Sequence, residues 1–412
     1  MMIYGLIISI VVVEYLFGLW LKMLNVRASR REIPSSLRGV YDEEKYARQQ
    51  AYFRVKSRFG LIESTVSTLV MLAMFACGGF AWIDTLAREW VTHPIGVTLV
   101  FFALVQLLLW VLELPMAYYN TFVIEERFGF NKSTRKTFVT DSIKSLLLNF
   151  VLMGLLLAAV TWIYYRMPQY FWLLAWGVMA VFMLFLQVFY SDLIVPLFNK
   201  QTPLAEGALR TAIEQFAAKA GFKVKDIYVM DGSKRSSHAN AYFAGFGPRK
   251  RIVLFDTLIE QLTTEEIVGV LAHEIGHNKR HHLPVSIAFS LLTSLVMLYL
   301  FSLVIGSPSI AAAAGCAQPS FHINLIVFSM LYAPLNVVLD MLLNVMSRRH
   351  EWQADEFARV NGLGKEVSSA LKKMSAHSLS NLTPHPWVVF MTYSHPTLYQ
   401  RVLHLESEKE EV

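Results

Sequence analysis

The segment LAHEIGHNKRHHLPVSIAFSLLTSLVMLYLF, residues 271–301, joins a polar helical pattern directly to a long apolar run. Within it, HEIGH spaces His273 and His277 four residues apart. On a helix this spacing puts both imidazoles on one face, within reach of a single tetrahedral ion. Glu274 can then reach a water molecule on that ion. The alternative is an amphipathic helix end with solvated histidines.

The apolar run is one of seven that are long enough to cross a bilayer, in a chain of 412 residues with 55% hydrophobic and 17% charged side chains. These runs cover roughly residues 3–25, 61–83, 96–120, 143–165, 170–195, 285–306 and 322–346. The first has no basic segment before its apolar core and no small-residue cleavage pattern after it, so we do not expect a removable signal peptide. The fold class indicated is a mainly α membrane protein.

The basic residues alternate between successive loops. They are dense after the first and third runs and sparse after the second and fourth, while residues 308–320 contain no Lys or Arg. By the positive-inside rule the N-terminus lies outside and the C-terminus in the cytoplasm, as an odd number of spans also requires. The net charge of +6 therefore reflects membrane topology, and no nucleic-acid partner is expected.

Four segments follow from these spans: residues 1–195 with spans one to five, 196–283 as a cytoplasmic part with the HEIGH helix, 284–346 with spans six and seven, and 347–412 as a second cytoplasmic part. In 196–283 we expect a helix that stops at Gly221, then three strands, VKDIYVMD, HANAYFAGF and RIVLFD, in a small β-meander. A turn at Gly247 and Pro248 would join the last two strands. Thr263 and Glu266 have the spacing of a capping box, which starts a helix expected to run to Pro284.

A catalytic zinc ion needs a third protein ligand and an open fourth position. The segment SRRHEWQADEF, residues 347–357, offers Glu351 and Asp355 four residues apart on the helical continuation of span seven. Glu351 can ligate, while Asp355 can hydrogen-bond a ligand histidine from behind. Taken alone, such an acidic pair is more often a solvated helix face. The cysteines, Cys77 and Cys316, lie outside these motifs, so neither a cysteine-rich zinc site nor a disulfide framework is expected.

A polar stripe also runs along span seven. Its members, three or four residues apart, are Asn336, Asp340, Asn344, Arg348, Glu351 and Asp355. Span three has a similar face with Gln106, Glu113 and Asn120. Because carboxylates are costly in hydrocarbon unless they are paired or hydrated, we expect these faces to line a hydrated cavity that is continuous with the metal site. The alternative is a dry bundle with hydrogen bonds between helices.

Five motifs, HEIGHNKRHH, SRRHEWQADEF, SSHANAYFAGFG, EERFGFNKST and SHPTLYQRV, resemble in order and spacing those of the type I CAAX prenyl proteases and their bacterial relatives. The resemblance covers nearly the whole chain. It implies a seven-helix intramembrane α-barrel around a water-filled chamber, closed by a cytoplasmic zinc metallopeptidase domain with one Zn²⁺ per chain. The implied activity is cleavage near the C-terminus of CAAX-type substrates, prenylated or membrane-associated, by a zinc-activated water and a Glu base.

The resemblance also implies roles for particular residues. His273, His277 and Glu351 would bind zinc, Glu274 would be the general base, and Asp355 would support a ligand from behind. Asn240 would hydrogen-bond the substrate backbone from an edge strand. Strand alternation puts Tyr242 on the face of Asn240, and the small Ala239 and Ala241 on the other face, where a second chain must approach. His395 and Arg401 would stabilise the oxyanion and its surroundings. The competing histidines, which spacing alone does not eliminate, are His238, His281, His377 and His385.

The sequence departs from the eukaryotic members in its short loop between spans six and seven and in lacking a recognisable retrieval ending. These departures favour a bacterial inner-membrane enzyme; a eukaryotic member would be expected in the endoplasmic reticulum membrane. Two other functions remain open at this stage. One is a seven-span transporter or receptor without catalytic metal, and the other is a structural zinc site, which would usually use four protein ligands.

Overall fold

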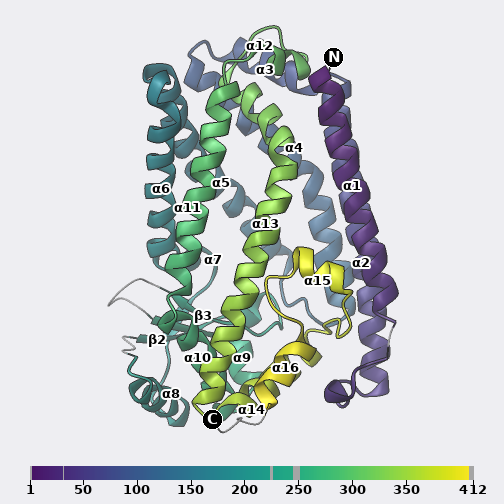
Figure 1. Cartoon of the computed structure of the whole chain (residues 1–412), viewed down its shortest axis with the longest axis vertical. Coiled ribbons are helices and arrows are strands. Elements are labelled where there is room, and N and C mark those ends of the chain that lie inside the picture. The colour runs from purple at the N-terminus through teal and green to yellow at the C-terminus, as the bar shows by residue number, and fades with distance from the viewer. Residues whose placement is uncertain (1, 31, 223–225, 245–250, 408–412) are drawn as a thin grey trace.

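The computed structural model describes residues 2–30, 32–222, 226–244 and 251–407. Among these residues, seven helical stretches are long and apolar enough to cross a membrane, and the expected number of spans is therefore confirmed. They stand side by side along the long axis of the molecule (Figure 1). Their bounds are Met2–Ala28, Glu43–Ala76, Pro94–Glu125, Arg135–Arg166, Pro168–Phe198, His282–Val304 and Phe321–Val360.

The first half of the chain forms most of the membrane part. Its helices are α1 (Met2–Ala28), α2 (Glu43–Ala76), α3 (Gly79–Trp90), α4 (Pro94–Tyr119), α5 (Arg135–Arg166), α6 (Phe171–Phe189) and α7 (Val195–Phe198). Short 3-10 helices cover Ser35–Leu37 and Pro168–Tyr170, and π-helical turns at Asn120–Glu125 and Tyr190–Ile194 extend α4 and α6.

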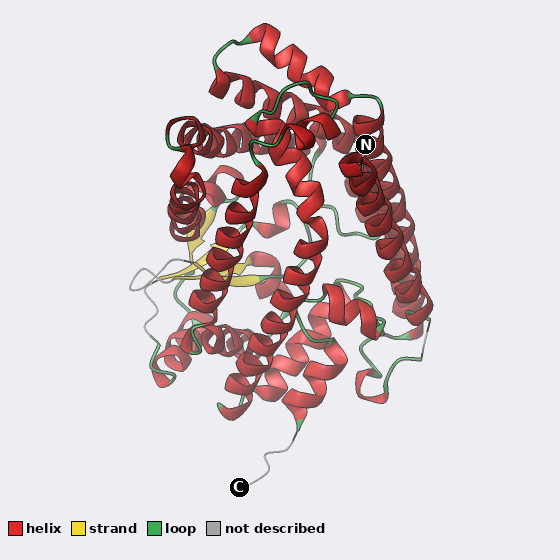
Figure 2. Cartoon of the chain, turned by 45° about the horizontal axis from the view of Figure 1, so that its top comes forward, coloured by secondary structure: helices red, strands yellow, loops and turns green. Residues whose placement is uncertain are grey.

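The second half carries the sheet and the helices around it. Its elements are β1 (Gln201–Pro203), α8 (Ala208–Lys219), β2 (Asp226–Met230), a 3-10 helix (Gly232–Lys234), β3 (Ala241–Ala244), β4 (Arg251–Phe255), α9 (Asp256–Gln261), α10 (Thr264–Lys279), α11 (His282–Val304), α12 (Pro308–Ala313), α13 (Phe321–Val360), α14 (Gly364–His377), α15 (Pro386–Thr392) and α16 (Leu398–Glu406). The strands lie beside the lower ends of the long helices, with α8, α10 and α14 (Figures 1 and 2).

The second membrane run differs from its expected bounds of 61–83. α2 ends at Ala76, and Gly78 adopts a left-handed conformation (φ 68°) that breaks the helix. The rest of the run belongs to α3, which lies with α12 at the end of the bundle where α1 starts (Figure 1). α3 is apolar on one face only, and it buries Phe80, Ile83 and Ala87. In the sequence, the apolar run extends beyond Ala76 because the next apolar residues form the buried face of the amphipathic helix α3.

The polar face of span three lines a hollow, as expected. A cavity of about 780 Å³ is lined by Gln106 and Glu113, and a second of about 580 Å³ by Glu113 and Asn120. Both cavities include Leu109 and Ala117 of α4, so they adjoin along that helix. The helices therefore surround a chamber, while its hydration and its continuity with the metal site stay predictions.

The stripe on α13 serves a different purpose over part of its length. Asn344 donates to the carbonyl of Met391 (3.0 Å), and Arg348 donates to the carbonyls of Val389 (3.0 Å) and Phe390 (3.2 Å) and to that of Tyr393. These carbonyls belong to the C-terminal end of α15 and the residue after it, where a helix leaves acceptors without partners. The lower stripe thus anchors α15 to α13.

The sheet is not the expected meander. Its strand order is β1-β2-β4-β3, with β4 parallel to β2 and antiparallel to β3. In a meander, β2 would pair with β3. Here residues 231–240 connect β2 to β3 across the place between them, and β4 occupies that place. β4 is the most buried strand, and Ile252, Val253 and Leu254 have no exposed surface, which explains its central place. The expected turn at Gly247 and Pro248 lies outside the described residues.

The helix that carries HEIGH begins as expected and ends earlier. The capping box of Thr263 and Glu266 is present at the start of α10. Glu266 also binds Lys373 (2.7 Å), which ties α10 to α14. The helix was expected to reach Pro284 but ends at Lys279, and His281 adopts a left-handed backbone conformation (φ 57°) before α11 starts. α13, in contrast, continues without a break from the membrane to Val360.

The chamber predicts which introduced cysteines react with water-soluble reagents. In a background in which Cys77 and Cys316 are replaced by Ser, we expect Gln106→Cys and Asn149→Cys, which line the larger cavity, to react with a polar maleimide in membranes. Leu155→Cys, on the exposed apolar face of α5, is the control and should stay unlabelled, because hydrocarbon excludes both the reagent and the thiolate. Equal labelling at all three positions would contradict the chamber.

Candidate metal centre

Three side chains from two helices converge at the base of the membrane part. His273 and His277 come from α10 and Glu351 from α13, and one ligand atom of each lies within 4.8 Å of the others. Nε2 of His273 is 3.4 Å from Glu351 Oε2, and Nε2 of His277 is 3.2 Å from Glu351 Oε1. The imidazoles and the carboxylate that were expected to share an ion thus face a common point.

A glycine allows these two helices to approach so closely. A Cβ added at Gly276 would lie 3.0 Å from the Cα and 3.1 Å from the carbonyl oxygen of Ala354, and 3.0 Å from Cβ of Phe357. Such distances are shorter than those of most Cβ atoms in proteins, so any side chain at position 276 would require the two helices to move apart by a few tenths of an ångström. Because Gly276 lies between the helix turns that carry His273 and His277, the closest approach coincides with the ligand group.

The chemistry of the group fits a divalent cation. Nε2 of His273 and Nε2 of His277 are only 3.1 Å apart, which favours an electrophile between them if both are unprotonated. Glu351 Oε2 is buried and has no hydrogen-bond partner. Burial lowers the pKa of His273, but hydrogen bonds with Asp355 and Glu351 outweigh it and raise this pKa to about 9. The carboxylates therefore favour positive charge at this point, and two imidazoles with one carboxylate form a typical catalytic zinc donor set.

Asp355 and Arg401 lie directly behind the ligands. Asp355 Oδ1 is 2.7 Å from Nδ1 of His273, which directs Nε2 of that ring to the ion site. Arg401 donates to both oxygens of Asp355, at 2.6 and 2.8 Å, and its Nη1 is 3.4 Å from Glu351 Oε2. Asp355 has no exposed surface and Arg401 is 8% exposed, so each charge depends on the other.

The second histidine is oriented by residues that the sequence did not predict as part of the site. Nδ1 of His277 lies 2.9 Å from Nδ1 of His282, whose Nε2 is 2.8 Å from Oε1 of Gln353. His350 stacks on His282 at 4.1 Å. If Nε2 of His277 faces the ion, its Nδ1–H can donate to His282, whose Nε2–H donates to Gln353. The HEIGHNKRHH run contains His282, but its contact with His277 depends on the break between α10 and α11, which spacing alone did not indicate.

The remaining predicted residues are placed around this group. Glu274, on the same helix, is partly buried, and burial raises its pKa while the neighbouring His273 and His277 offset part of the rise. His395 Nε2 is 3.3 Å from Glu351 Oε1, and its Nδ1 is 2.9 Å from the hydroxyl of Ser394. The structure therefore brings His395 next to the ligands.

The competing histidines have other surroundings. His238 stacks on Phe130 (4.7 Å), His281 precedes α11, and His377 ends α14. His385 caps α15 by accepting from the amide of Trp387. None of them makes a hydrogen bond or ion pair with His273, His277 or Glu351 among the described residues.

The predicted substrate strand lies at the edge of the sheet, since β3 has β4 as its one neighbouring strand within the described ranges. Ala239 and Ala241 pack toward the cluster that includes α10, whereas Tyr242 packs on the other face with Val195 and Val253. The carbonyl of Asn240 accepts from the amide of Phe255 (3.0 Å), and its side-chain Oδ1 accepts from the amide of Ala241 (2.9 Å). The expected alternation is thus present, but Tyr242 contacts Gln201 and buried neighbours.

Residues 22–200 match the family described as CAAX prenyl protease N-terminal, five membrane helices, and residues 203–409 match peptidase family M48. Three similar curated relatives are the CAAX prenyl protease 1 homologs of Oryza sativa subsp. japonica and Homo sapiens and the CAAX prenyl protease 1 of Saccharomyces cerevisiae. Identity to the rice protein is 37% over 97% of this chain and 96% of that protein. The human protein is 34% identical over 95% and 93%, and the yeast protein 34% identical over 93% and 91%.

The crystal structure of Ste24p from S. mikatae superposes with a TM-score of 0.92 and 31% identity, over 98% of this chain and 99% of that one. The transporter or receptor alternative has no support in these similarities. The expected bacterial source has none either, since the relatives compared above are eukaryotic.

The tight helix crossing leads to a test of metal binding. We expect Gly276→Ala to push α10 away from α13 and to lower zinc affinity about five- to 100-fold, because overpacking here costs about 1–3 kcal/mol and displaces the ligands from each other. Gly177→Ala is the control, since no atom lies within 4 Å of an added Cβ there. Zinc titration with a competing chelator measures both; unchanged affinity in Gly276→Ala would show that the crossing does not position the ligands.

Proposed function

Since this chain belongs to peptidase family M48, as an integral membrane metalloprotease of the CAAX prenyl protease type, we propose that it is a zinc endopeptidase that removes C-terminal residues from CAAX-type protein substrates. The observation that carries the proposal is the meeting of His273, His277 and Glu351, with one buried carboxylate oxygen left without a hydrogen bond. Substrates would be prenylated or otherwise associated with the membrane, since the relatives are CAAX prenyl proteases and Glu351 lies on the same continuous helix as span seven.

The donor set supports one zinc ion per chain, held by His273, His277 and Glu351. Bound there, zinc would act as a Lewis acid that lowers the pKa of water and polarises a peptide carbonyl. Glu274 is the residue that takes the proton from the attacking water and delivers it to the leaving nitrogen. Its partly buried position beside both histidines supports this role.

His395 is the residue we propose to stabilise the charge that develops on the substrate oxygen. Its contact with Glu351 puts it at the rim of the ligand group, and with 59% of its side chain exposed it can also reach a bound peptide. Arg401 acts from behind: it is buried, occupied by Asp355, and close to Glu351. Arg401 therefore stabilises the site's surroundings, and Asp355 holds His273 in position.

The substrate peptide would pair with the free edge of β3, because edge pairing holds a chain extended at little conformational cost. The side-chain amide of Asn240 would hydrogen-bond the substrate backbone. Its Oδ1 now accepts from the amide of Ala241, and this bond would have to break first. Ala239 and Ala241 are small, which leaves room for the second chain. Tyr242 contributes to this site through the packing of the strand on Val195.

The proposed topology puts the peptidase parts, residues 196–283 and 347–412, in the cytoplasm. The basic residues of the segments after spans one and three, compared with the sparse ones of the opposite loops, support this orientation. In a eukaryotic cell the corresponding membrane would be that of the endoplasmic reticulum, with the N-terminus on its lumenal side.

The test is cleavage of a fluorogenic CAAX-type peptide, farnesylated and unmodified, by the purified protein with its bound zinc measured. We expect Glu274→Gln to keep one zinc ion and to lose about 100- to 10,000-fold in kcat/KM, because only proton transfer is removed. Glu351→Gln should lose the zinc as well. A chelator should abolish wild-type activity, and added zinc should restore it.

The matched control is Glu265→Gln, which removes an exposed carboxylate from the same helix and should leave both zinc and turnover unchanged. Turnover that survives in Glu274→Gln would refute its role as base. Zinc retained with turnover intact in that variant would favour a structural metal.

A further inference from the structure

The free edge of β3 ends at a defined point. A few residues before β3 starts at Ala241, the segment Phe130–Lys132 pairs with residues 235–237, with Asn131 opposite Ser236 in an antiparallel bridge. The amide of Ser237 donates to the carbonyl of Phe130 (3.2 Å), and the amide of Lys132 donates to the carbonyl of Arg235 (3.1 Å). A membrane loop therefore already fills the backbone positions that precede Ala239.

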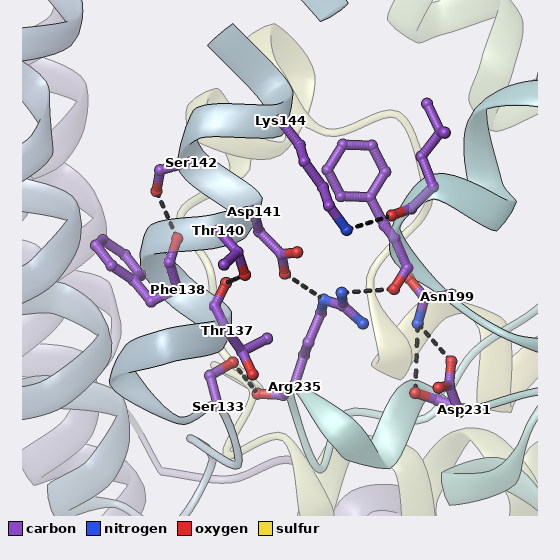
Figure 3. A network of polar contacts seen from close by, with 12 residues as sticks. Ser133, Thr137, Phe138, Thr140, Asp141, Ser142, Lys144, Asn199, Asp231 and Arg235 are labelled. Carbon is purple, nitrogen blue, oxygen red and sulfur yellow. Dashed lines mark hydrogen bonds and ion pairs between the residues drawn. The ribbon is translucent and has the colours of Figure 1, made fainter. Parts of the chain in front are cut away.

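The loop segment Phe130–Lys132 thus forms a barrier at the end of the edge, and contacts on both sides hold it in place. Arg235 donates to Asp141 on α5 (2.8 Å) and to the carbonyl of Phe198 at the end of α7 (2.6 Å), as Figure 3 shows for the guanidinium and the Asp141 carboxylate. On the other side, Arg48 of α2 donates to the carbonyl of Phe128 (2.6 Å). Such charge-assisted bonds keep the loop from moving aside to let a longer peptide through.

The barrier limits a substrate in one direction. A peptide that pairs antiparallel with β3 runs its carboxyl end from Ala241 toward Ser237. At about 3.3 Å per residue, this stretch holds roughly four residues. The amide of Ser237 already donates to the carbonyl of Phe130, so it is not free to bind the substrate backbone. The peptide must therefore leave the edge here and end in a neighbouring hollow.

Two small hollows and a large cavity adjoin this point. The small ones, of about 210 and 260 Å³, share His377; the first is lined by His238 and Ala239, the second by Ser237 and Phe130 together with Lys45 and Arg48. Among the described residues, no Asp or Glu lines either hollow, and neither Lys45 nor Arg48 forms an ion pair.

The large cavity has the opposite charge. At the same point of the chain, Ser236 and His238 also line the 780 Å³ cavity, whose wall carries Glu113, Glu125 and Asp141. Arg235 also lines this cavity, but it is paired with Asp141 and Lys56 with Glu125, while Glu113 has no ion pair among the described residues, so the wall keeps a net negative charge. An anionic group that leaves the edge at Ser237 is therefore attracted to the basic hollow and not to the chamber.

We propose that the basic hollow of Lys45, Arg48 and His377 binds the free α-carboxylate at the C-terminus of the substrate. The inference rests on the proposed function and deepens it: the hollow and the barrier at Phe130 together set how many residues lie between the cleaved bond and the end of the peptide. Lys45 and Arg48 are specificity residues in this scheme, and they have no part in the chemistry at the metal.

The experiment compares two quenched fluorescent peptides of one sequence, ending in a free carboxylate or in a carboxamide, with the zinc-loaded full chain. We expect the wild type to prefer the carboxylate peptide about three- to tenfold in kcat/KM, as partly exposed charge pairs provide. In Lys45→Gln, and further in Lys45→Gln with Arg48→Gln, this acid-to-amide ratio should fall toward one. A folding defect would lower both rates together and leave the ratio unchanged.

Arg54→Gln is the matched control, because it removes an exposed cation from the same helix that lines neither hollow, and it should keep the wild-type ratio. Equal cleavage of acid and amide by the wild type, or a wild-type ratio in the double variant, would overturn the carboxylate site while the peptidase stands. Failure of the wild type to cleave either peptide, with zinc bound, would instead overturn the proposed function on which this inference rests.

Discussion

The backbone contact between α10 and α13 is the constraint on which the rest of the site depends. Gly276 lies so close to Ala354 that an added Cβ would be 3.0 Å from its Cα, and His273, His277 and Glu351 are within three residues of this contact along their helices. Two helices whose ligands are more than 70 residues apart along the chain (His277 and Glu351) therefore hold one ion site without any loop contributing a ligand. Ligands on packed helices are held more rigidly than ligands on loops, which a catalytic metal centre requires.

The charges behind the ligands connect the C-terminal segment to the same crossing. Arg401 of α16 neutralises the fully buried Asp355, and Arg348 binds the end of α15, so α13 holds the chain on both sides of His395. Each charge would be costly to bury alone, and together they fix the segment that carries His395 relative to the ligands. The C-terminal helices thus form one wall of the site.

The membrane part and the sheet are joined by backbone pairing as well as by side chains. The loop after α4 extends the edge ahead of β3, and Arg235 ties that edge to α5 and to the end of α7. The strand proposed for substrate binding is consequently held by the helices that surround the chamber. A peptide that reaches the metal from the chamber would meet a sheet edge whose position the membrane helices determine.

The sequence by itself was sufficient for the features that are local or periodic: the seven spans, the capping box at Thr263, the continuous helix through span seven, and the spacing that puts His273 and His277 on one face. These depend on hydrophobic runs and on contacts a few residues apart. Only the tertiary structure decided the strand order, the break at His281, the chain from His277 through His282 to Gln353, and the role of Gly276. Each of these depends on which distant backbones come into contact, and that is determined by packing across the whole molecule and not by spacing along the chain.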